Sequence, residues 1–212
     1  MPRRKFVFWE VDVQADFMLP GGKLYVPGAE KIIPNVQRLV GAALEANIFI
    51  VSSADAHSEH DPEFSRFPPH CIRGTAGARI IPEGLAQKFL LIPNDPSFQL
   101  PNDFESYPQV VIEKQTLNDF DNPLAGEIVQ RLGPDVEYIV FGVVTEYCVM
   151  CAASGLLERG RKVSIVRDAI ETMNAEDGDR TLGELKSLGA RMVNTQEIVS
   201  EIPAAADAPH RS

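Results

Sequence analysis

The sequence predicts an α/β fold of three layers, in which helices cover both faces of a mainly parallel central sheet. Short apolar runs recur at residues 6–12, 47–53 and 138–144, as expected of strands that are covered on both faces. Helical patterns lie between the strands along the chain, and this alternation is typical of a parallel sheet. The length of 212 residues is most simply interpreted as a single domain, residues 1–212.

The expected elements follow this alternation in order. Residues 29–46 come after a turn at Pro27 and Gly28 and carry apolar side chains at helical spacing, so they predict a helix that links the first two strands in a β-α-β unit. The same patterns predict the later elements, which are strands at 110–114 and 162–167 and helices at 124–132, 149–157 and about 178–188.

Two long segments interrupt the alternation, residues 54–84 and 92–107, and both are rich in proline, glycine and polar residues. Connections of this length usually carry functional residues or cover a site. Residues 93–107 could therefore close over a pocket and alter its shape. The tail, residues 202–212, is expected to be frayed and to take no part in catalysis.

The composition is that of a globular protein, with 44% hydrophobic and 24% charged residues. The 20 basic and 30 acidic residues give a formal charge of −10, which repels nucleic-acid phosphates and anionic lipids, so we expect no nucleic-acid partner and no membrane partner. No apolar run approaches the roughly 20 residues that cross a bilayer, and residues 1–5 lack the apolar stretch that follows the basic end of a signal peptide. A cytoplasmic location is therefore expected.

Three cysteines, Cys71, Cys148 and Cys151, are too few for a disulfide framework and odd in number, so at least one is expected to be a free thiol. Cys148 lies where a predicted strand gives way to a helix, in the first helical turn. The helix dipole and the free backbone N–H groups there favour a thiolate, which is the nucleophilic form. A buried cysteine is also often an inert small hydrophobic residue, and Cys151 fits this second interpretation better.

Asp12 and Lys114 each end a predicted strand. The carboxyl ends of strands in an open α/β sheet are where ligands collect, so both side chains could converge on Cys148. The ammonium would then stabilise a thiolate, and the carboxylate would take the thiol proton and pass it to a leaving amine. Taken singly, Asp12 also fits a turn or cap, and Lys114 a solvated edge charge. Glu10 is expected on the same side of its strand as Asp12, with either a basic partner or a less covered strand around it.

Three of the four histidines lie in the first long segment. Asp55 and His57 are separated by one residue, so both could point to the same side of an extended segment, and His60 and His70 follow. Asp55, His57 and His70 would supply three ligands to a metal ion and leave positions open for water or substrate. The same spacing also fits polar loop residues that only face solvent.

Several short motifs combine these candidates in a fixed order. They lie at residues 12–17, 20–24, 26–28, 55–57, 67–71, 74–78 and 142–149. In these motifs, and from Phe6 to about Val199, the sequence resembles the isochorismatase-like family of cysteine hydrolases and, within it, the nicotinamidase branch. The resemblance implies an isochorismatase-like α/β/α fold and a homo-oligomer.

By this resemblance, Asp12, Lys114 and Cys148 match the catalytic triad of the family. The backbone amides of Val144 and Cys148 match an oxyanion hole. A cis peptide bond is implied between Val144 and Thr145, and it would turn these amides toward the oxyanion.

The resemblance also implies a metal ion and a pocket for a ring. It matches Asp55, His57 and His70 to the metal ligands, with zinc expected first and manganese or iron as alternatives. Aromatic side chains would sandwich the ring, although such residues taken singly are often core packing. The expected pocket residues are Phe17, Phe67, His60, Thr145 and Tyr147.

The chain departs from the family pattern at three positions. Ala15 stands where asparagine is common, and Ala56 and Phe67 stand where tryptophan is common. The identity of the ring is therefore inferred from the resemblance alone.

The expected function is hydrolysis of nicotinamide, a small-molecule amide, to nicotinate and ammonia through a cysteine thioester, as in NAD salvage. One alternative is another amidohydrolase of the family that acts on a small amide or on a carbamoyl or ureide compound. A second is a metal-hydroxide hydrolase in which Cys148 is structural. A third is a metal-binding or redox-sensing module without turnover, which is disfavoured because a sensor needs neither Lys114 nor Asp12.

Overall fold

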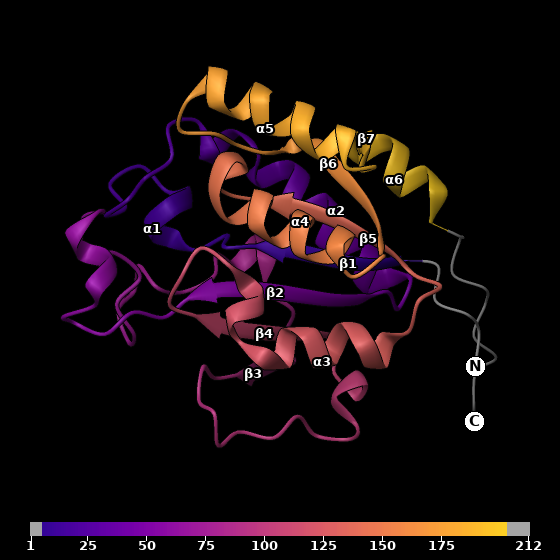
Figure 1. Ribbon diagram of the computed structural model, residues 1–212, viewed down its shortest axis with the longest axis horizontal. Helices are drawn as coiled ribbons and strands as arrows, with labels where there is room; N and C mark the ends of the chain where they lie inside the picture. The colour runs from indigo at the N-terminus through magenta and orange to yellow at the C-terminus, as the bar shows by residue number, and fades with distance from the viewer. Residues whose placement is uncertain (1–5, 203–212) are drawn as a thin grey trace.

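The computed structural model describes residues 6–202 and shows one seven-stranded sheet between two helical layers (Figure 1). The strand order is β3-β4-β2-β1-β5-β6-β7, and every pairing of neighbours is parallel. The prediction of a layered α/β fold is therefore confirmed. The strands are β1 (Phe6–Val11), β2 (Phe49–Asp55), β3 (Phe89–Ile92), β4 (Gln109–Lys114), β5 (Glu137–Gly142), β6 (Lys162–Ile170) and β7 (Arg191–Val193).

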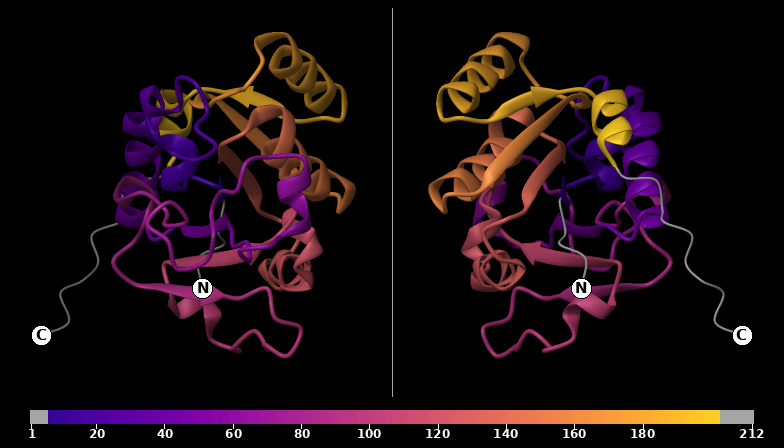
Figure 2. Two further views of the ribbon diagram at one scale, coloured as in Figure 1. Left: turned by 90° about the vertical axis from the view of Figure 1, so that its left-hand side faces the viewer. Right: turned by 90° about the vertical axis from the view of Figure 1, so that its right-hand side faces the viewer.

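Helices cover both faces of the sheet, as the two side views show (Figure 2). Helices α2 and α6 pack on one face, and α3, α4 and α5 pack on the other. The central strand β1 buries Trp9 and Val11 in the core beside α3 and α4, and Phe8 in the core beside α2, so its alternating apolar side chains serve two cores. The helices are α1 (Ala15–Met18), α2 (Ile33–Glu45), α3 (Pro123–Leu132), α4 (Met150–Glu158), α5 (Ala175–Ser187) and α6 (Thr195–Glu201).

Most elements that the sequence predicts are present, with ends that differ by a few residues. The elements α1, β3, β7 and α6 were not predicted, because none exceeds seven residues and a run that short carries too little periodicity. The helix predicted from residue 149 begins earlier, as a π-helical turn that continues into α4. The short helical turns are η1 (Ala29–Lys31), η2 (Pro62–Ser65), η3 (Pro82–Gly84), η4 (Phe104–Ser106), η5 (Asp119–Asp121) and η6 (Thr145–Val149).

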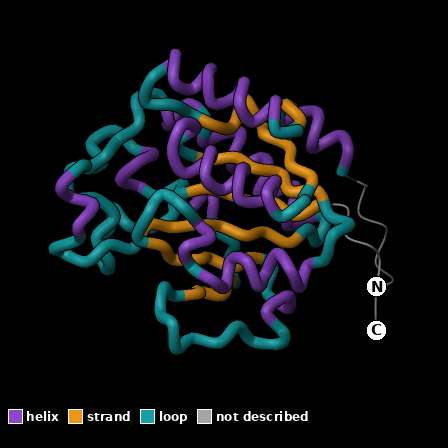
Figure 3. The backbone as a smooth tube through the Cα atoms, in the orientation of Figure 1, coloured by secondary structure: helices purple, strands orange, loops and turns teal. Residues whose placement is uncertain are grey.

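Loops gather at the carboxyl ends of the strands, on the left of Figures 1 and 3. Much of the long segment after β2 lies there. The second long segment, residues 93–107, lies instead at the bottom of Figure 1, below β3. It contributes no residue to the cavity at Cys148, so the idea that it could close over the pocket does not hold in this structure. Of the predicted frayed tail, only Ile202 is described, and residues 203–212 lie outside the described range.

Glu10 and Asp12 lie on opposite faces of the sheet, so the expectation that they share a side was wrong. The reason is Asp12 itself, whose φ of 50° is left-handed and breaks the alternation of the strand. The Ser52 hydroxyl donates to Glu10 at 2.6 Å, and the Ser53 hydroxyl donates to Asp12 at 2.7 Å. Consecutive side chains on β2 point to opposite faces, and their acidic partners do the same.

Glu10 has neither of the two environments expected for it. Its exposed fraction is 0%, so the strand is covered there. Its hydrogen-bond donors are neutral, the Ser52 hydroxyl and, at 3.3 Å, the side-chain amide of Gln109.

Within residues 6–202, none of the helices is long and apolar enough to span a membrane.

Candidate active site

Three strand ends bring Asp12, Lys114 and Cys148 into contact. The Nζ atom of Lys114 lies 2.8 Å from Oδ2 of Asp12 and 3.6 Å from Sγ of Cys148. All three side chains are buried. Asp55 joins them, since Lys114 Nζ also donates to its Oδ1. The candidates that lie far apart in the sequence therefore form one cluster.

The sheet explains this meeting. Lys114 and Asp55 are cross-strand partners at the ends of β4 and β2, and β1 lies between β2 and β5. Cys148 follows β5 through Gly142, which has a φ of 118°. A Cβ atom at Gly142 would lie 2.0 Å from the carbonyl oxygen of Val11, so only glycine lets the chain turn this close to β1.

The cis peptide bond lies between Val143 and Val144. The prediction of a cis bond between Val144 and Thr145 was therefore wrong by one residue, because β5 ends at Gly142 and the chain turns earlier than expected. Val143, Val144 and Cys148 all line the same cavity. The role of the Val144 and Cys148 amides as an oxyanion hole stays a prediction.

Lys114 is the only lysine or arginine among the described residues in direct contact with this cluster of buried acids. Burial lowers the pKa of its ammonium, but Asp12 and Asp55 outweigh burial and hold that pKa well above the usual range. Burial likewise acts to raise the pKa of Asp55, yet Lys114 and the neighbouring histidines hold it well below the usual range. Lys114 is thus charged and Asp55 ionised at neutral pH.

The surroundings of Cys148 favour the protonated thiol. Burial raises the pKa of the Cys148 thiol well above its usual value, and the opposing charge of Lys114 does not compensate, because Asp12 and Asp55 raise it further. Burial of the sulfur thus opposes the effect of the helix terminus, which was expected to favour a thiolate. Burial also raises the pKa of Asp12, although Lys114 opposes this. A carboxylate of increased basicity thus lies beside the thiol that must lose its proton.

Asp55, His57 and His70 form a compact group of possible metal ligands. Their candidate ligand atoms lie within 4.8 Å of one another, and all three residues are buried. Oδ2 of Asp55 lies 3.6 Å from Nε2 of His57 and 3.5 Å from Nε2 of His70. The two histidines meet because their segments pair, with the His57 N–H donating to the Cys71 carbonyl at 3.1 Å.

Each imidazole ring, of His57 and of His70, has an oxygen atom near its Nδ1. This contact leaves Nε2 as the ring nitrogen that faces Asp55. Nδ1 of His57 lies 3.1 Å from Oδ2 of Asp61, and Nδ1 of His70 lies 2.7 Å from the carbonyl oxygen of Pro68. With the ring proton on Nδ1, each Nε2 would present a lone pair to the Asp55 side. One carboxylate and two imidazoles converging in this way fit a divalent transition metal.

A small cavity lies above these groups, with about 30 Å³ of free volume. That is room for a water molecule or two, so a ring-sized ligand enters only when side chains at the rim rearrange. The residues that line the cavity are Phe17, Leu24, Asp55, Glu63, Phe67, His70, Leu117, Val143, Val144, Tyr147, Cys148 and Met173.

Three of the five predicted pocket residues line this cavity, namely Phe17, Phe67 and Tyr147. His60 does not: it is exposed at the surface and is absent from the lining. Thr145 does not either, because its hydroxyl donates to the Glu171 carbonyl at 2.7 Å and its side chain borders a different hollow beside α5. These two predictions were wrong about position.

Sequence reasoning missed several residues that the fold brings to the site. Leu117, Met173 and Glu63 line the cavity, and burial next to the Asp55 charge raises the pKa of Glu63. The Ser53 hydroxyl donates a hydrogen bond to Asp12, and Oδ2 of Asp61 lies 3.1 Å from Nδ1 of His57. The only available signal was sequence proximity, such as the four-residue spacing of Asp61 after His57, and in a loop this spacing has no fixed geometry.

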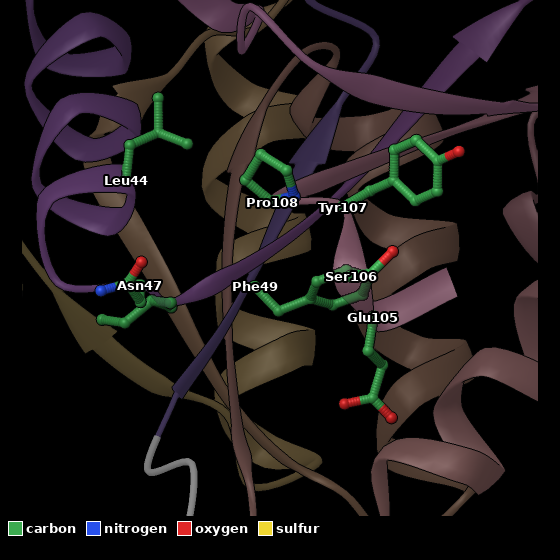
Figure 4. A pocket seen from close by; sticks show the side chains of 8 residues that line it. Leu44, Asn47, Phe49, Glu105, Ser106, Tyr107 and Pro108 are labelled. Atoms are coloured by element: carbon green, nitrogen blue, oxygen red, sulfur yellow. The ribbon is translucent and has the colours of Figure 1, made fainter. Parts of the chain in front are cut away.

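A larger cavity of about 350 Å³ lies at the other end of the sheet (Figure 4). It adjoins the amino ends of β2 and β4, and Asn47, Glu105, Ser106 and Tyr107 are among the residues around it. It is remote from Cys148, because parallel strands separate the two ends. Size alone therefore does not identify the site, and the gathered reactive groups do.

The parallel sheet and the polar groups at its carboxyl edge define a class, the three-layer α/β proteins that gather reactive side chains at the ends of their strands. The chain belongs to the isochorismatase family, whose Isochorismatase domain matches residues 8–88 and 84–197. It is 25% identical over 223 aligned residues to the nicotinamidase of Acinetobacter baylyi. The alignment covers 89% of this chain and 92% of that protein.

Solved structures agree with this assignment. Pyrazinamidase of Pyrococcus horikoshii in complex with zinc is 30% identical, with a TM-score of 0.71 over 90% of this chain and 99% of that one. N-carbamoylsarcosine amidase from Thermoplasma acidophilum has a TM-score of 0.69 over 90% of this chain and 96% of its own, and at 19% identity it shows a shared fold only. The protein is thus an amidohydrolase of the isochorismatase family.

Proposed function

We propose that the protein is a nicotinamidase, which hydrolyses nicotinamide to nicotinate and ammonia in NAD salvage. The observation that carries this proposal is that Cys148, which lines an aromatic-walled cavity, contacts Lys114, and that Lys114 in turn contacts Asp12. The similarity to a nicotinamidase over most of both chains supports the same substrate.

The first half of the reaction forms a thioester. Asp12 takes the thiol proton of Cys148 on Oδ2, the oxygen that lies 2.8 Å from Nζ of Lys114. The sulfur attacks the carboxamide carbon, and the backbone amides of Val144 and Cys148 receive the oxyanion. Asp12 then passes its proton to the leaving nitrogen, and ammonia departs.

The second half releases the acid. Asp12 removes a proton from a water molecule, the resulting hydroxide attacks the thioester carbon, and Cys148 recovers its proton as nicotinate leaves. Lys114 keeps its charge throughout and offsets the negative charge that moves between sulfur and carboxylate. Phe17, Phe67 and Tyr147 hold the ring.

A divalent metal fits the Asp55, His57 and His70 group, and we propose zinc first, with manganese or iron as alternatives. The complex of the Pyrococcus horikoshii pyrazinamidase with zinc supports this choice. When bound, the ion supplies a Lewis-acid site that orients the ring nitrogen of the substrate.

The second candidate is hydrolysis of a carbamoyl or ureide compound, which the fold shared with N-carbamoylsarcosine amidase keeps open. Charge argues against a substrate that carries a carboxylate. The lining of the cavity contains Asp55 and Glu63 but no lysine or arginine, so none of its side chains offers a substrate carboxylate a lysine or arginine partner. An uncharged carboxamide such as nicotinamide meets no such penalty.

Ammonia release from purified protein and nicotinamide tests the proposal directly. Cys148→Ala should abolish release, and Cys151→Ala, which changes a thiol one helical turn away, should retain it. N-carbamoylsarcosine and small aliphatic amides belong in the same assay, and preference for one of them would replace nicotinamide as the substrate. Full activity of Cys148→Ser would instead favour a metal-hydroxide hydrolase, and no turnover of any amide would favour a sensor.

The proposal extends to the setting of the enzyme. A cytoplasmic homo-oligomer that acts on a diffusible small amide fits the role in NAD salvage. Light scattering of the purified protein tests the oligomer, since a mass equal to that of one chain would contradict it.

A further inference from the structure

The cavity beside Cys148 is smaller than the substrate, so part of its wall must move when the substrate enters. Its free volume of about 30 Å³ holds a water molecule or two, whereas nicotinamide carries a six-membered ring and a carboxamide. Side chains that pack in a core lose many contacts when they are displaced. The side chain that moves should therefore line the cavity and pack in neither core.

Most apolar side chains of the lining are held by one of the two cores. Those that belong to a core or pack against one are Phe17, Leu24, Leu117, Val143, Val144, Tyr147 and Cys148. Phe67 is held by its neighbours instead, since its ring centre lies 6.4 Å from that of His70 and 5.9 Å from that of Tyr147. The guanidinium carbon of Arg66 lies 5.5 Å from the same ring centre. Met173 is thus the remaining apolar residue of the lining.

The side chain of Met173 is free to rotate. Its exposed fraction is 39%, it belongs to neither core, and it nevertheless lines the cavity. A methionine side chain is unbranched, has three rotatable bonds and adapts to what it contacts. Its rotation toward solvent breaks no core packing, so this movement opens the cavity at the lowest cost.

The backbone around Met173, in contrast, is fixed to the turn that carries Cys148. Glu146 precedes Cys148 by two residues in that turn. Its Oε1 accepts hydrogen bonds from the N–H groups of Met173 and Asn174, both at 2.9 Å. Its Oε2 accepts one from the Thr172 hydroxyl at 2.6 Å. A backbone movement would break several bonds to a charged acceptor at once, so the opening is confined to the Met173 side chain.

We propose that Met173 is a specificity-determining residue, whose side chain turns outward to admit the substrate and, on its return, limits the size of the amide that the cavity holds. The substrate class that it selects is a compact planar carboxamide without bulky groups on its ring. The thioether also makes a favourable contact with an aromatic ring. The choice of nicotinamide rests on the proposed function, but the size limit applies to any molecule that reaches Cys148.

Kinetics with ring-methylated amides test the size limit. Met173→Ala should raise kcat/KM for 5-methylnicotinamide or 6-methylnicotinamide, relative to nicotinamide, by about 10-fold or more, because one carbon in an apolar pocket is worth about 10- to 200-fold. Met173→Leu conserves the volume and should keep the wild-type ratio. Leu188→Ala truncates an apolar side chain of 58% exposure at the end of α5 and is the matched control, which should change nothing. Unchanged ratios for both methylated amides in Met173→Ala would overturn the proposal.

Alkylation of Cys148 gives a second readout that does not depend on the substrate. The sulfur displaces iodide from iodoacetamide or from its N-phenyl derivative, while Asp12 takes the thiol proton. The two reagents share the reacting carbon and differ in the ring, so the ratio of their rates, measured by mass spectrometry of the Cys148 peptide, reports the access of a ring. Met173→Ala should raise this ratio about 10-fold in favour of the N-phenyl reagent, and Leu188→Ala should not.

The two experiments separate the size limit from the identity of the substrate. A raised alkylation ratio in Met173→Ala without turnover of nicotinamide would refute the substrate and leave the role of Met173 standing. An alkylation ratio equal to that of the wild type would refute the role itself. Because Met173 is exposed and lies outside both cores, Met173→Ala should unfold at the Tm of the wild type, and a change in either ratio is then a change at the cavity.

Discussion

At the level of single residues, the site depends on one ammonium among several buried acids. Lys114 contacts both Asp12 and Asp55, and no other lysine or arginine in residues 6–202 makes an ion pair with either of them. A buried ion pair adds little net stability, but removal of one partner leaves the other charge uncompensated. Lys114 is therefore required for the fold of the site as well as for its chemistry.

Lys114→Met should abolish turnover and destabilise the protein by about 3–5 kcal/mol at neutral pH. The methionine fills the space of the lysine stem but leaves two buried carboxylates without a counter-ion. Urea denaturation measures the loss, with Lys186→Met on the exposed last turn of α5 as the control. A Lys114→Met protein as stable as that control would show that the carboxylates are not both charged.

Glu10 makes a separate prediction about pH. Burial raises its pKa from 4.5 to about 8, although the Ser52 hydrogen bond opposes this. A carboxyl group whose pKa is higher in the folded state than in the unfolded state contributes its full stability at pH values below the unfolded-state pKa. It loses that contribution as the pH rises toward the folded-state pKa. Between pH 4.5 and about 8, Glu10 should thus lower the free energy of unfolding by about 1.4 kcal/mol per pH unit.

Glu10→Gln should remove this slope, because glutamine resembles the neutral acid at every pH. Denaturation at pH 5, 6, 7 and 8 should show the variant gaining on the wild type at each step. Parallel curves for the two proteins would mean that Glu10 is ionised when buried. Glu10 lies on the opposite face of the sheet from the triad, so activity at pH 6 should be unchanged.

At the level of elements, the sequence predicts the strands and the residues at their ends better than it predicts the geometry of those ends. Alternation and apolar runs place Lys114 and Asp12 at the carboxyl ends of their strands. The parallel pairing of the strands then brings these ends to the same edge of the sheet. The left-handed backbone of Asp12 and the early turn after Gly142 depend on contacts between distant segments, which no local pattern encodes. For the same reason Ser53 could not be recognised as a partner of Asp12.

The short helix α1 supports the metal group from outside. Oδ2 of Asp16 accepts a hydrogen bond from the backbone N–H of Cys71 at 2.8 Å, next to His70, and Oδ1 accepts one from the N–H of Lys23 at 3.0 Å. Gly77 packs so closely that a Cβ atom there would lie 2.2 Å from the Asp16 carboxylate. One carboxylate thus joins three segments around a predicted ligand.

Asp16→Ala should weaken zinc binding about 10- to 100-fold, as removal of outer support around a metal site commonly does. Competition with a chromophoric chelator measures the affinity. Asp95→Ala removes a carboxylate that also accepts a backbone N–H, from Ser97 at 2.8 Å, but in an exposed loop, and it should bind zinc as the wild type does. Unchanged affinity in Asp16→Ala would show that His70 holds its place without this support.

At the level of the whole molecule, the order of strands determines where the site lies. The chain builds β2, β3 and β4 on one side of β1 and then crosses to add β5, β6 and β7 on the other. The connections on the two sides of β1 therefore diverge, and a crevice forms at the carboxyl ends of β1 and β5. Asp12 follows the first of these strands and Cys148 follows the second.

This architecture couples the metal group to the stability of the entire chain. Asp55 ends a central strand, whereas His57 and His70 come from the long segment that follows it, so their convergence requires the folded sheet. An ion that binds only this folded group should stabilise the protein by about 2.7 kcal/mol at 100 times its dissociation constant, which is about 5 to 10 °C in Tm for a chain of this size. Thermal unfolding of chelator-treated protein, with and without added zinc, measures the shift. His57→Ala should lose it and His60→Ala, at an exposed histidine, should keep it; an equal shift in both variants would place the ion elsewhere.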